Sequence, residues 1–298
     1  MPWTQAHVVV PQDQTDLVEL TFESMGAVSI TLGDAKDDPV METLPEEIKL
    51  WPTVKVTGLF EFNPDGLDQL RQQMNQAFNR DISQQVSLEI LQDQPWERAW
   101  LEHFKPMQFG RKLWICPTGQ THTLNASEAD ATIIELDPGL AFGTGTHPTT
   151  ALCLEWLDSQ DLTEQLVIDY GCGSGILAIA ALKLGAAKAI GIDHDPQALI
   201  ASQDNAKKNA VADRLEVLST NDRPAQNCDL LMANILAGVL IELAETLVEL
   251  IRPGGKIVLS GILQEQTGSV IKAFEHAIVF DPAAQKEDWM RLTGTRKA

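Results

Sequence analysis

The fold of the larger part of this chain is decided by the stretch VIDYGCGSG, residues 167–175. An apolar strand leads into a turn with three glycines, and an alanine-rich helix follows the turn. Backbone that lacks Cβ atoms can approach a bound ligand closely at such a turn. The glycines are spaced Gly-x-Gly-x-Gly, so the third comes one position earlier than in the Gly-x-Gly-x-x-Gly fingerprint of dinucleotide-binding folds. Gly171 and Gly173 are therefore candidate ligand contacts.

Asp193 is the acidic residue that accompanies this turn. It follows Gly171 by 22 residues and closes the next apolar strand. A carboxylate at that position can accept hydrogen bonds from both hydroxyls of a ribose. The alternative is a tight strand-to-helix turn with an exposed aspartate, but the glycines and the spaced acid together favour a nucleoside ligand.

Strands and helices alternate around the glycine-rich turn. The strand candidates are 166–170, 189–193, 215–218, 229–234 and 256–260, and the helix candidates are 176–184, 196–209, 236–250 and 264–273. Repeated β-α crossovers predict an α/β fold with a parallel, doubly wound sheet. Ligands in such sheets bind at the carboxyl ends of the strands, near the point where the strand order reverses.

Two further segments carry chemistry. The first is LDPGLAFGTGTHPTT, residues 136–150, in which Thr146 is suited to cap a helix and Pro148 is suited to its first turn. Backbone amides and hydroxyl groups at the start of such a helix can bind a carboxylate. A capped loop without a ligand is the alternative for this segment. In NILA, residues 234–237, Asn234 offers a neutral acceptor that can orient an amine lone pair, or it caps the following helix.

The glycine-rich turn and Asp193 together resemble the class I S-adenosylmethionine-dependent methyltransferases. Three further segments match the bacterial ribosomal protein L11 methyltransferase family: residues 142–150, the Asn234 segment and LWICP at 113–117. Together with the glycine-rich turn and Asp193, they make residues 96–298 closely resemble that family, and the resemblance is weaker over the residues before 96. The Asn234 segment is similar to the Asn-Pro-Pro-Tyr element of amino-group methyltransferases but lacks its last three residues. That departure fits an aliphatic amine better than a planar nucleobase amine.

The resemblance implies a fold, a reaction and a set of site residues. The fold is a mostly parallel, seven-stranded Rossmann-like sheet behind a smaller substrate-recognition domain. The reaction moves methyl groups from S-adenosylmethionine, which leaves as S-adenosylhomocysteine, to the α-amine and lysine side chains of a basic large-subunit ribosomal protein, with no metal. The implied cofactor contacts are Thr150, Gly171, Asp193 and Asn234, with Gly173, Thr144, Gly145, Thr146 and His147 beside them. Asn234 is the candidate for orienting the amine, and His147 competes with water as the proton acceptor.

The first ninety residues have a different pattern. Their apolar runs follow the order β-α-β-β-α-β, which predicts a ferredoxin-like α+β domain. Its first helix is expected at 15–25, with Leu17, Leu20 and Met25 on one face, and its second at 67–78. We therefore predict a substrate-recognition domain at 1–92, a connecting helix or linker at 93–108 with an aromatic packing stripe, and a methyltransferase domain at 109–298.

Composition limits the partners. The chain has 298 residues and a net charge of −20, and residues 1–92 hold five Lys and Arg against fifteen Asp and Glu. Such a surface repels nucleic acid and attracts a basic protein, unless the acidity serves solubility alone. No apolar run reaches membrane-spanning or signal-peptide length, and the four cysteines are dispersed. We therefore expect a reduced, cytoplasmic location without membrane binding.

Three classes of function stay open from the sequence. The favoured class is a protein amine methyltransferase. A NAD-dependent oxidoreductase is the second, disfavoured by the glycine spacing. The third is a binding module that kept the fold without the activity. Within the first class, another protein or a small amine remains an alternative acceptor.

Overall fold

A computed structural model of the chain describes residues 3–36, 51–61, 71–73, 75–76, 86–91, 105–120, 131–136 and 147–298. The chain divides into two compact units, Met1–Ala99 and Trp100–Ala298. The predicted connecting helix and its aromatic stripe lie outside the described residues. Strand β5 begins at Met107, so the last residues of the predicted linker already belong to the second unit. The exact domain boundaries stay a prediction.

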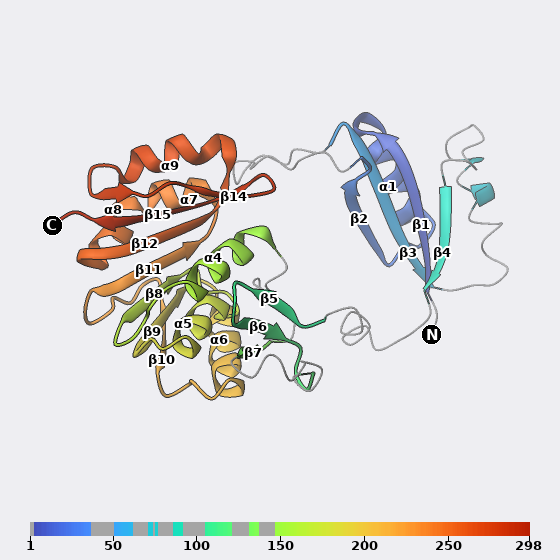
Figure 1. The fold of residues 1–298 in the computed structure, drawn as a ribbon. Coiled ribbons are helices and arrows are strands. Elements are labelled where there is room, and N and C mark those ends of the chain that lie inside the picture. Colours follow the sequence, from blue (N-terminus) through green and yellow to red (C-terminus); the bar gives the residue numbers. More distant parts are fainter. Residues whose placement is uncertain are drawn as a thin grey trace. The chain divides into compact units, whose positions relative to one another are not determined.

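The first unit contains a four-stranded antiparallel sheet (Figure 1). Its elements are β1 (Trp3–Pro11), a short 3-10 turn (Gln12–Gln14), α1 (Thr15–Ser24), β2 (Ser29–Asp34), β3 (Thr53–Glu61) and β4 (Val86–Leu91). The strand order is β2-β3-β1-β4. Only residues 71–73 and 75–76 of the predicted second helix are described, and they are helical. The ferredoxin-like arrangement therefore stays a prediction.

Helix α1 buries a different face from the predicted one. Val18 and Phe22 are fully buried, whereas Leu17 and Leu20 are 47% and 62% exposed. Helix α1 has two apolar rows, and the row with the larger aromatic side chain packs on the sheet because it buries more surface. The Phe22 ring meets Phe60 edge-on at 5.5 Å between centroids, and a Cβ at Gly58 would lie 2.6 Å from this ring. Gly58 thus allows the close approach.

The second unit is built on an eight-stranded sheet. Its strands are β8 (Leu166–Tyr170), β9 (Lys188–Asp193), β10 (Leu215–Ser219), β11 (Cys228–Asn234), β12 (Ile251–Leu263), β13 (Ile278–Phe280), β14 (Ala284–Lys286) and β15 (Trp289–Arg296). The order is β10-β9-β8-β11-β12-β15-β13, with β14 paired to β15 beside this path. Strands β8 to β12 are parallel, and β15 runs antiparallel to its neighbours.

The expected number of seven strands was wrong because of β14. This strand of three residues forms a hairpin with β15 through a turn at Glu287, whose φ is 55°. Such a short strand leaves no recognisable alternation in the sequence. The sequence analysis also named no strand after residue 260, so β13 and β15 were missed with it.

Helices cover both faces of this sheet (Figure 1). One apolar core holds α4 (Pro148–Asp158) and α5 (Ile176–Lys183) against the sheet and receives Ala206 from α6 (Pro196–Lys208). The other core holds α7 (Ala237–Glu242), α8 (Ala244–Glu249) and α9 (Thr267–Phe274). The predicted helix at 236–250 is broken at Leu243, and a 3-10 turn (Gln264–Gln266) precedes α9.

A small sheet that the sequence did not predict packs beside α4 and α5. It consists of β5 (Met107–Phe109), β6 (Leu113–Cys116) and β7 (Thr132–Glu135). The buried Asp158 carboxylate, at the end of α4, accepts backbone N–H groups of Arg111, Lys112 and Leu113 at 2.6 to 3.2 Å. This anchor joins the β5–β6 turn to the main sheet's helix layer.

In the part of the chain that the structure describes, every helix is too short or too polar to cross a lipid bilayer.

Candidate active site

A cleft of about 1220 Å³ opens at the carboxyl ends of the parallel strands of the second unit. The strand order reverses between β8 and β11, and the cleft lies at this reversal, as the sequence predicted. Among its lining residues are His147, Thr150, Gly171, Gly173, Asp193 and Asn234. The structure therefore brings together six of the predicted site residues, which are up to 87 positions apart in the sequence. Thr144, Gly145 and Thr146 lie outside the described residues.

The glycine-rich turn after β8 has a backbone that favours glycine. The φ angles of Gly171, Gly173 and Gly175 are 74°, 53° and 77°, a region that is strained for residues with a side chain. A Cβ at Gly171 would collide with the Ile235 side chain. The Gly171 N–H donates to the carbonyl of Ile192 at 2.7 Å and fixes the turn to the end of β9.

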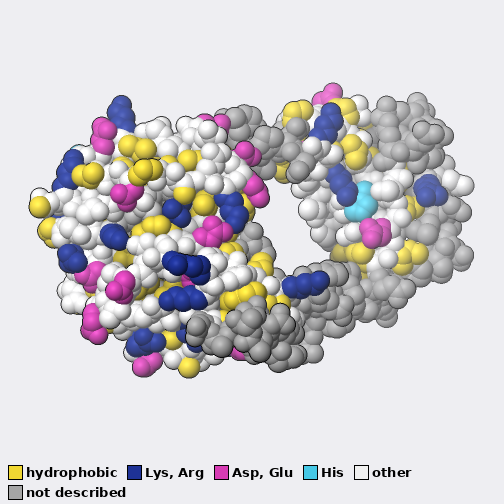
Figure 2. Space-filling model, in the orientation of Figure 1, with side chains coloured by type: hydrophobic (Ala, Val, Ile, Leu, Met, Phe, Trp, Pro, Cys, Tyr) yellow, Lys and Arg dark blue, Asp and Glu magenta, His cyan; other side chains and the backbone are white. Residues whose placement is uncertain are grey.

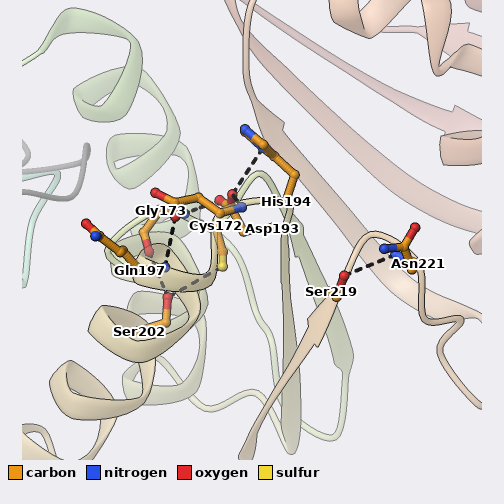
Figure 3. Close-up of polar contacts among 9 residues, drawn as sticks. Cys172, Gly173, Asp193, His194, Gln197, Ser202, Ser219 and Asn221 are labelled. Atoms are coloured by element: carbon orange, nitrogen blue, oxygen red, sulfur yellow. Dashed lines mark hydrogen bonds and ion pairs between the residues drawn. The ribbon is translucent and has the colours of Figure 1, made fainter.

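Asp193 is held in place by two backbone donors. Its Oδ2 accepts the Gly173 N–H at 2.9 Å, and its Oδ1 accepts the Asp195 N–H at 3.0 Å. The His194 ring lies 3.3 Å from Oδ1 (Figure 3). Asp193 is only 7% exposed, yet it lines the cleft. Because a carboxylate has about four acceptor positions, it retains capacity for hydroxyl donors of a ligand.

Asp169 is a site residue to which the sequence analysis gave no role. It is the second-last residue of β8, is 1% exposed and also lines the cleft. Burial raises the pKa of Asp169 to about 7; the Ala178 N–H, which it accepts at 3.1 Å, opposes the shift, and the nearby Asp193 adds to it. The signal for it was an acid two positions before the first glycine.

Asn234 and Thr150 contact each other. The Asn234 Nδ2 donates to the buried Thr150 Oγ1 at 3.3 Å across 84 positions of sequence. With the amide nitrogen engaged by Thr150, the amide oxygen of Asn234 is the group left to accept a hydrogen bond from a ligand. The two elements concerned are the end of β11 and the first turn of α4.

His147 caps α4 and stacks on Trp289. Its Nδ1 lies 2.8 Å from Thr149 Oγ1 and accepts the Thr149 N–H at 3.4 Å. Its ring meets the Trp289 ring edge-on at 4.8 Å between centroids. Burial lowers the pKa of His147, and the charge of Glu287 opposes this shift. The cap is His147 rather than the predicted Thr146 because its imidazole reaches the second amide of the helix.

One wall of the cleft was not predicted. Leu236, Val239, Glu242 and Leu243 line it from the start of α7 onward, and Trp289 lines it from β15. Leu236 and Val239 are 56% and 39% exposed although they are apolar. This apolar lip adjoins Asn234, on the side of β8 opposite Asp193. No motif marks these residues, because only the tertiary fold brings Trp289 of β15 and the residues of α7 to one cleft.

Acidic side chains outnumber the two histidines, His147 and His194, in the described lining of the cleft. Four carboxylic acids line it, namely Asp169, Asp193, Asp195 and Glu242, and its described lining contains no Lys or Arg. A pyrophosphate would find no lysine or arginine partner among these residues. A ligand with positive charge on or near its nucleoside is favoured instead.

Comparisons with known proteins agree with this geometry. A family model described as ribosomal protein L11 methyltransferase (PrmA) matches residues 2–297. The ribosomal protein L11 methyltransferase of Vibrio cholerae is 48% identical over 303 residues, with 99% of each chain covered. That of Pasteurella multocida is 47% identical over 295 residues, again with 99% of each covered. A solved ribosomal protein L11 methylase from Lactobacillus delbrueckii subsp. bulgaricus is 32% identical with a TM-score of 0.60, covering 65% of this chain and all of that one.

Proposed function

The chain belongs to the ribosomal protein L11 methyltransferase family, and on that premise we propose that it methylates the α-amine and lysine ε-amines of ribosomal protein L11 with S-adenosylmethionine. One observation carries the proposal: a single cleft is lined by the glycine-rich turn, by Asp193 and by the side-chain amide of Asn234. Its described lining also contains carboxylates and no Lys or Arg.

The residues present fit S-adenosylmethionine. Asp193 has acceptor capacity for two ribose hydroxyls, and Gly171 and Gly173 leave the backbone of the turn without Cβ atoms at the cleft. The acidic lining suits a sulfonium and an ammonium, and it disfavours the pyrophosphate of NAD. When bound, the sulfonium supplies an electrophilic methyl group.

The chain must present the acceptor nitrogen with a free lone pair. At pH 7, deprotonating a lysine of ordinary pKa costs about 4–5 kcal/mol, and deprotonating an α-amine costs about 1 kcal/mol. The apolar lip of Leu236, Val239 and Trp289 removes water from the entering side chain and so lowers the pKa of its ammonium, whereas the charge of Glu242 in the same wall opposes this shift. The amide oxygen of Asn234 then accepts an N–H of the neutral amine and aims its lone pair at the methyl group.

His147 acts as a helix cap in this proposal, and water accepts the proton. We expect His147→Ala to lower the free energy of unfolding by about 1 kcal/mol, because the cap of α4 is lost. We expect kcat to keep its dependence on pH, since the imidazole is already engaged with Thr149 and Trp289. The measurements are urea unfolding and kcat from pH 5.5 to 9. Loss of the low-pH limb of kcat in the variant alone would instead make His147 the base.

The first unit offers an acidic surface for a basic substrate. Asp16, Glu19 and Glu23 share one side of α1, next to the exposed Leu17 and Leu20. On the face of the second unit seen in Figure 2, by contrast, acidic and basic side chains are interspersed. We propose that the acidic side of α1 docks the basic ribosomal protein, away from the reacting amine, whose deprotonation a nearby carboxylate would oppose.

We expect added salt to raise the KM for ribosomal protein L11 because exposed charges are screened. The double variant Asp16→Asn/Glu23→Gln should raise this KM about fivefold at low salt and weaken its salt dependence, with the KM for S-adenosylmethionine unchanged. The matched control is Glu164→Gln/Asp213→Asn, which neutralises two exposed carboxylates before β8 and β10, at the strand ends opposite the cleft. A salt-independent KM, or equal effects of both double variants, would contradict this docking surface.

The proposed function is tested by supplying S-adenosylmethionine with a labelled methyl group together with purified ribosomal protein L11, and by mapping the label by mass spectrometry. Label on the α-amine and lysines is expected. Label on other proteins of a ribosomal extract but not on L11 would reassign the substrate. Stabilisation against heat by NAD but not by S-adenosylhomocysteine would revive the oxidoreductase alternative.

A further inference from the structure

Helix α6 carries a row of polar side chains that faces the back of the glycine-rich turn. Ser202 and Asn205 are separated by three positions and so lie on one face of the helix. The Ser202 Oγ donates to the carbonyl of Gly173 at 2.9 Å, and the Asn205 Nδ2 donates to the carbonyl of Ser174 at 2.9 Å. Two consecutive carbonyls of the turn are therefore held by one helix. Figure 3 shows Ser202 pointing from this helix toward Gly173 and Cys172.

These contacts hold Gly173 at both of its backbone groups. Its N–H donates to Asp193 and its carbonyl accepts from Ser202, both at 2.9 Å. Gly173 has a φ of 53°, and without a side chain its backbone is free to reorient once a partner is removed. Rotation here would withdraw the N–H that fixes Asp193 Oδ2. The orientation of the Asp193 carboxylate thus depends on a hydroxyl that lies outside the cleft lining.

The packing between α6 and the turn is close enough to transmit this dependence. Ser202 is fully buried, and its Oγ also lies 3.4 Å from the Cys172 Sγ. A Cβ at Gly175 would lie 2.9 Å from the Ser202 Oγ, so the third glycine is what lets the helix approach. Burial raises the pKa of the Cys172 thiol to about 12, which leaves the thiol neutral and makes it a spacer rather than a reactive group.

We propose that Ser202 and Asn205 are positioning residues for methyl-donor binding, which they support by holding the Gly173–Ser174 backbone so that Gly173 and Asp193 present a fixed surface to the nucleoside. This role rests on the proposed function, because it assumes that S-adenosylmethionine occupies the cleft. It concerns donor binding alone, since neither residue lies on the side of Asn234 and the apolar lip.

The test compares the variants Ser202→Ala and Asn205→Ala in the full-length chain. Calorimetry with S-adenosylhomocysteine should show the Kd raised about tenfold in Ser202→Ala and about threefold in Asn205→Ala, since a buried carbonyl loses its partner in each. The KM for S-adenosylmethionine should rise in parallel, while the KM for ribosomal protein L11 stays within twofold. Asn205→Ala introduces a strong helix former at a half-buried position, so this variant folds even if the first does not.

Two controls separate positioning from a general loss of stability. Gln203→Ala changes an exposed residue of the same helix and should leave the Kd unchanged. Asp158→Ala breaks the remote anchor of the β5–β6 turn and should lower the melting temperature without changing the Kd below it. Equal Kd values for the wild type and both α6 variants would overturn the positioning role of Ser202 and Asn205 and would leave the proposed function standing. No binding by the wild type would overturn the proposed function, and the inference with it.

Discussion

Asp193→Ala is expected to weaken the binding of S-adenosylhomocysteine about 100-fold or more. In the proposed donor site this carboxylate accepts both ribose hydroxyls, and each hydrogen bond to a charged group contributes about 1.5–3 kcal/mol. The same substitution releases the N–H groups of Gly173 and Asp195, so the turn loses its fixed partner as well. Isothermal calorimetry with wild type and variant measures the change directly. A Kd within threefold of wild type would remove Asp193 from the nucleoside site.

The matched control for this variant is Asp195→Ser. It also removes one carboxylate from the cleft lining, but serine can still cap α6 by accepting the Gln197 N–H, as Asp195 does at 2.9 Å. We expect its Kd to stay within about threefold of wild type. If both variants lost affinity equally, the loss would reflect the summed negative charge of the cleft rather than hydrogen bonds from Asp193.

Asn234→Ala is expected to lower kcat about 100-fold while raising the Kd of S-adenosylhomocysteine less than fivefold. An orienting group acts on the reacting geometry rather than on donor binding, so its removal appears in kcat. Thr150→Val should lower kcat by a smaller factor of about ten, because valine leaves Asn234 in place but removes the oxygen that orients its amide at 3.3 Å. Single-turnover methylation of ribosomal protein L11 gives these rates without interference from product release. Equal losses in kcat and in donor affinity would make Asn234 a donor contact only.

Asn234→Asp provides a test with a definite sign in its pH dependence. A carboxylate at this position stabilises the ammonium form of the acceptor and so raises the pKa of the amine. The rate of this variant should lie far below that of the wild type at neutral pH, and it should recover as pH rises, reaching its plateau at a higher pH than in the wild type. A uniform loss across pH would show that position 234 does not face the acceptor nitrogen.

Much of the site was readable from the sequence because its residues follow strands directly. Gly171, Asp193 and Asn234 come at or just after the ends of β8, β9 and β11, where a parallel sheet brings such positions to one edge. The nearly continuous apolar runs that define these strands were equally local. The loop residues Thr144 to Thr146 lie outside the described residues, so their assignment to the donor stays a prediction.

Other predictions were wrong or missing for two reasons. Some features depend on which of two apolar surfaces buries more area, and some strands are too short to leave a pattern in the sequence. Helix α1 has two apolar rows, and the choice of the row with Phe22 required knowledge of Phe60 and Gly58 on the opposing strand. The strands β5, β7, β13 and β14 each have three or four residues, too few to show a period. The break at Leu243 likewise divides what looks like one helical pattern.

The sequence by itself determined the parallel strands, the glycine-rich turn and the chemistry at the strand ends, because the periodicity and side-chain type of neighbouring residues are sufficient to specify them. Only the tertiary structure decided that Thr150 holds Asn234, that Trp289 and α7 line one cleft, and that Ser202 and Asn205 hold the turn from behind. Each of these contacts joins residues far apart in the chain, and their approach is set by how helices and strands pack rather than by any local pattern.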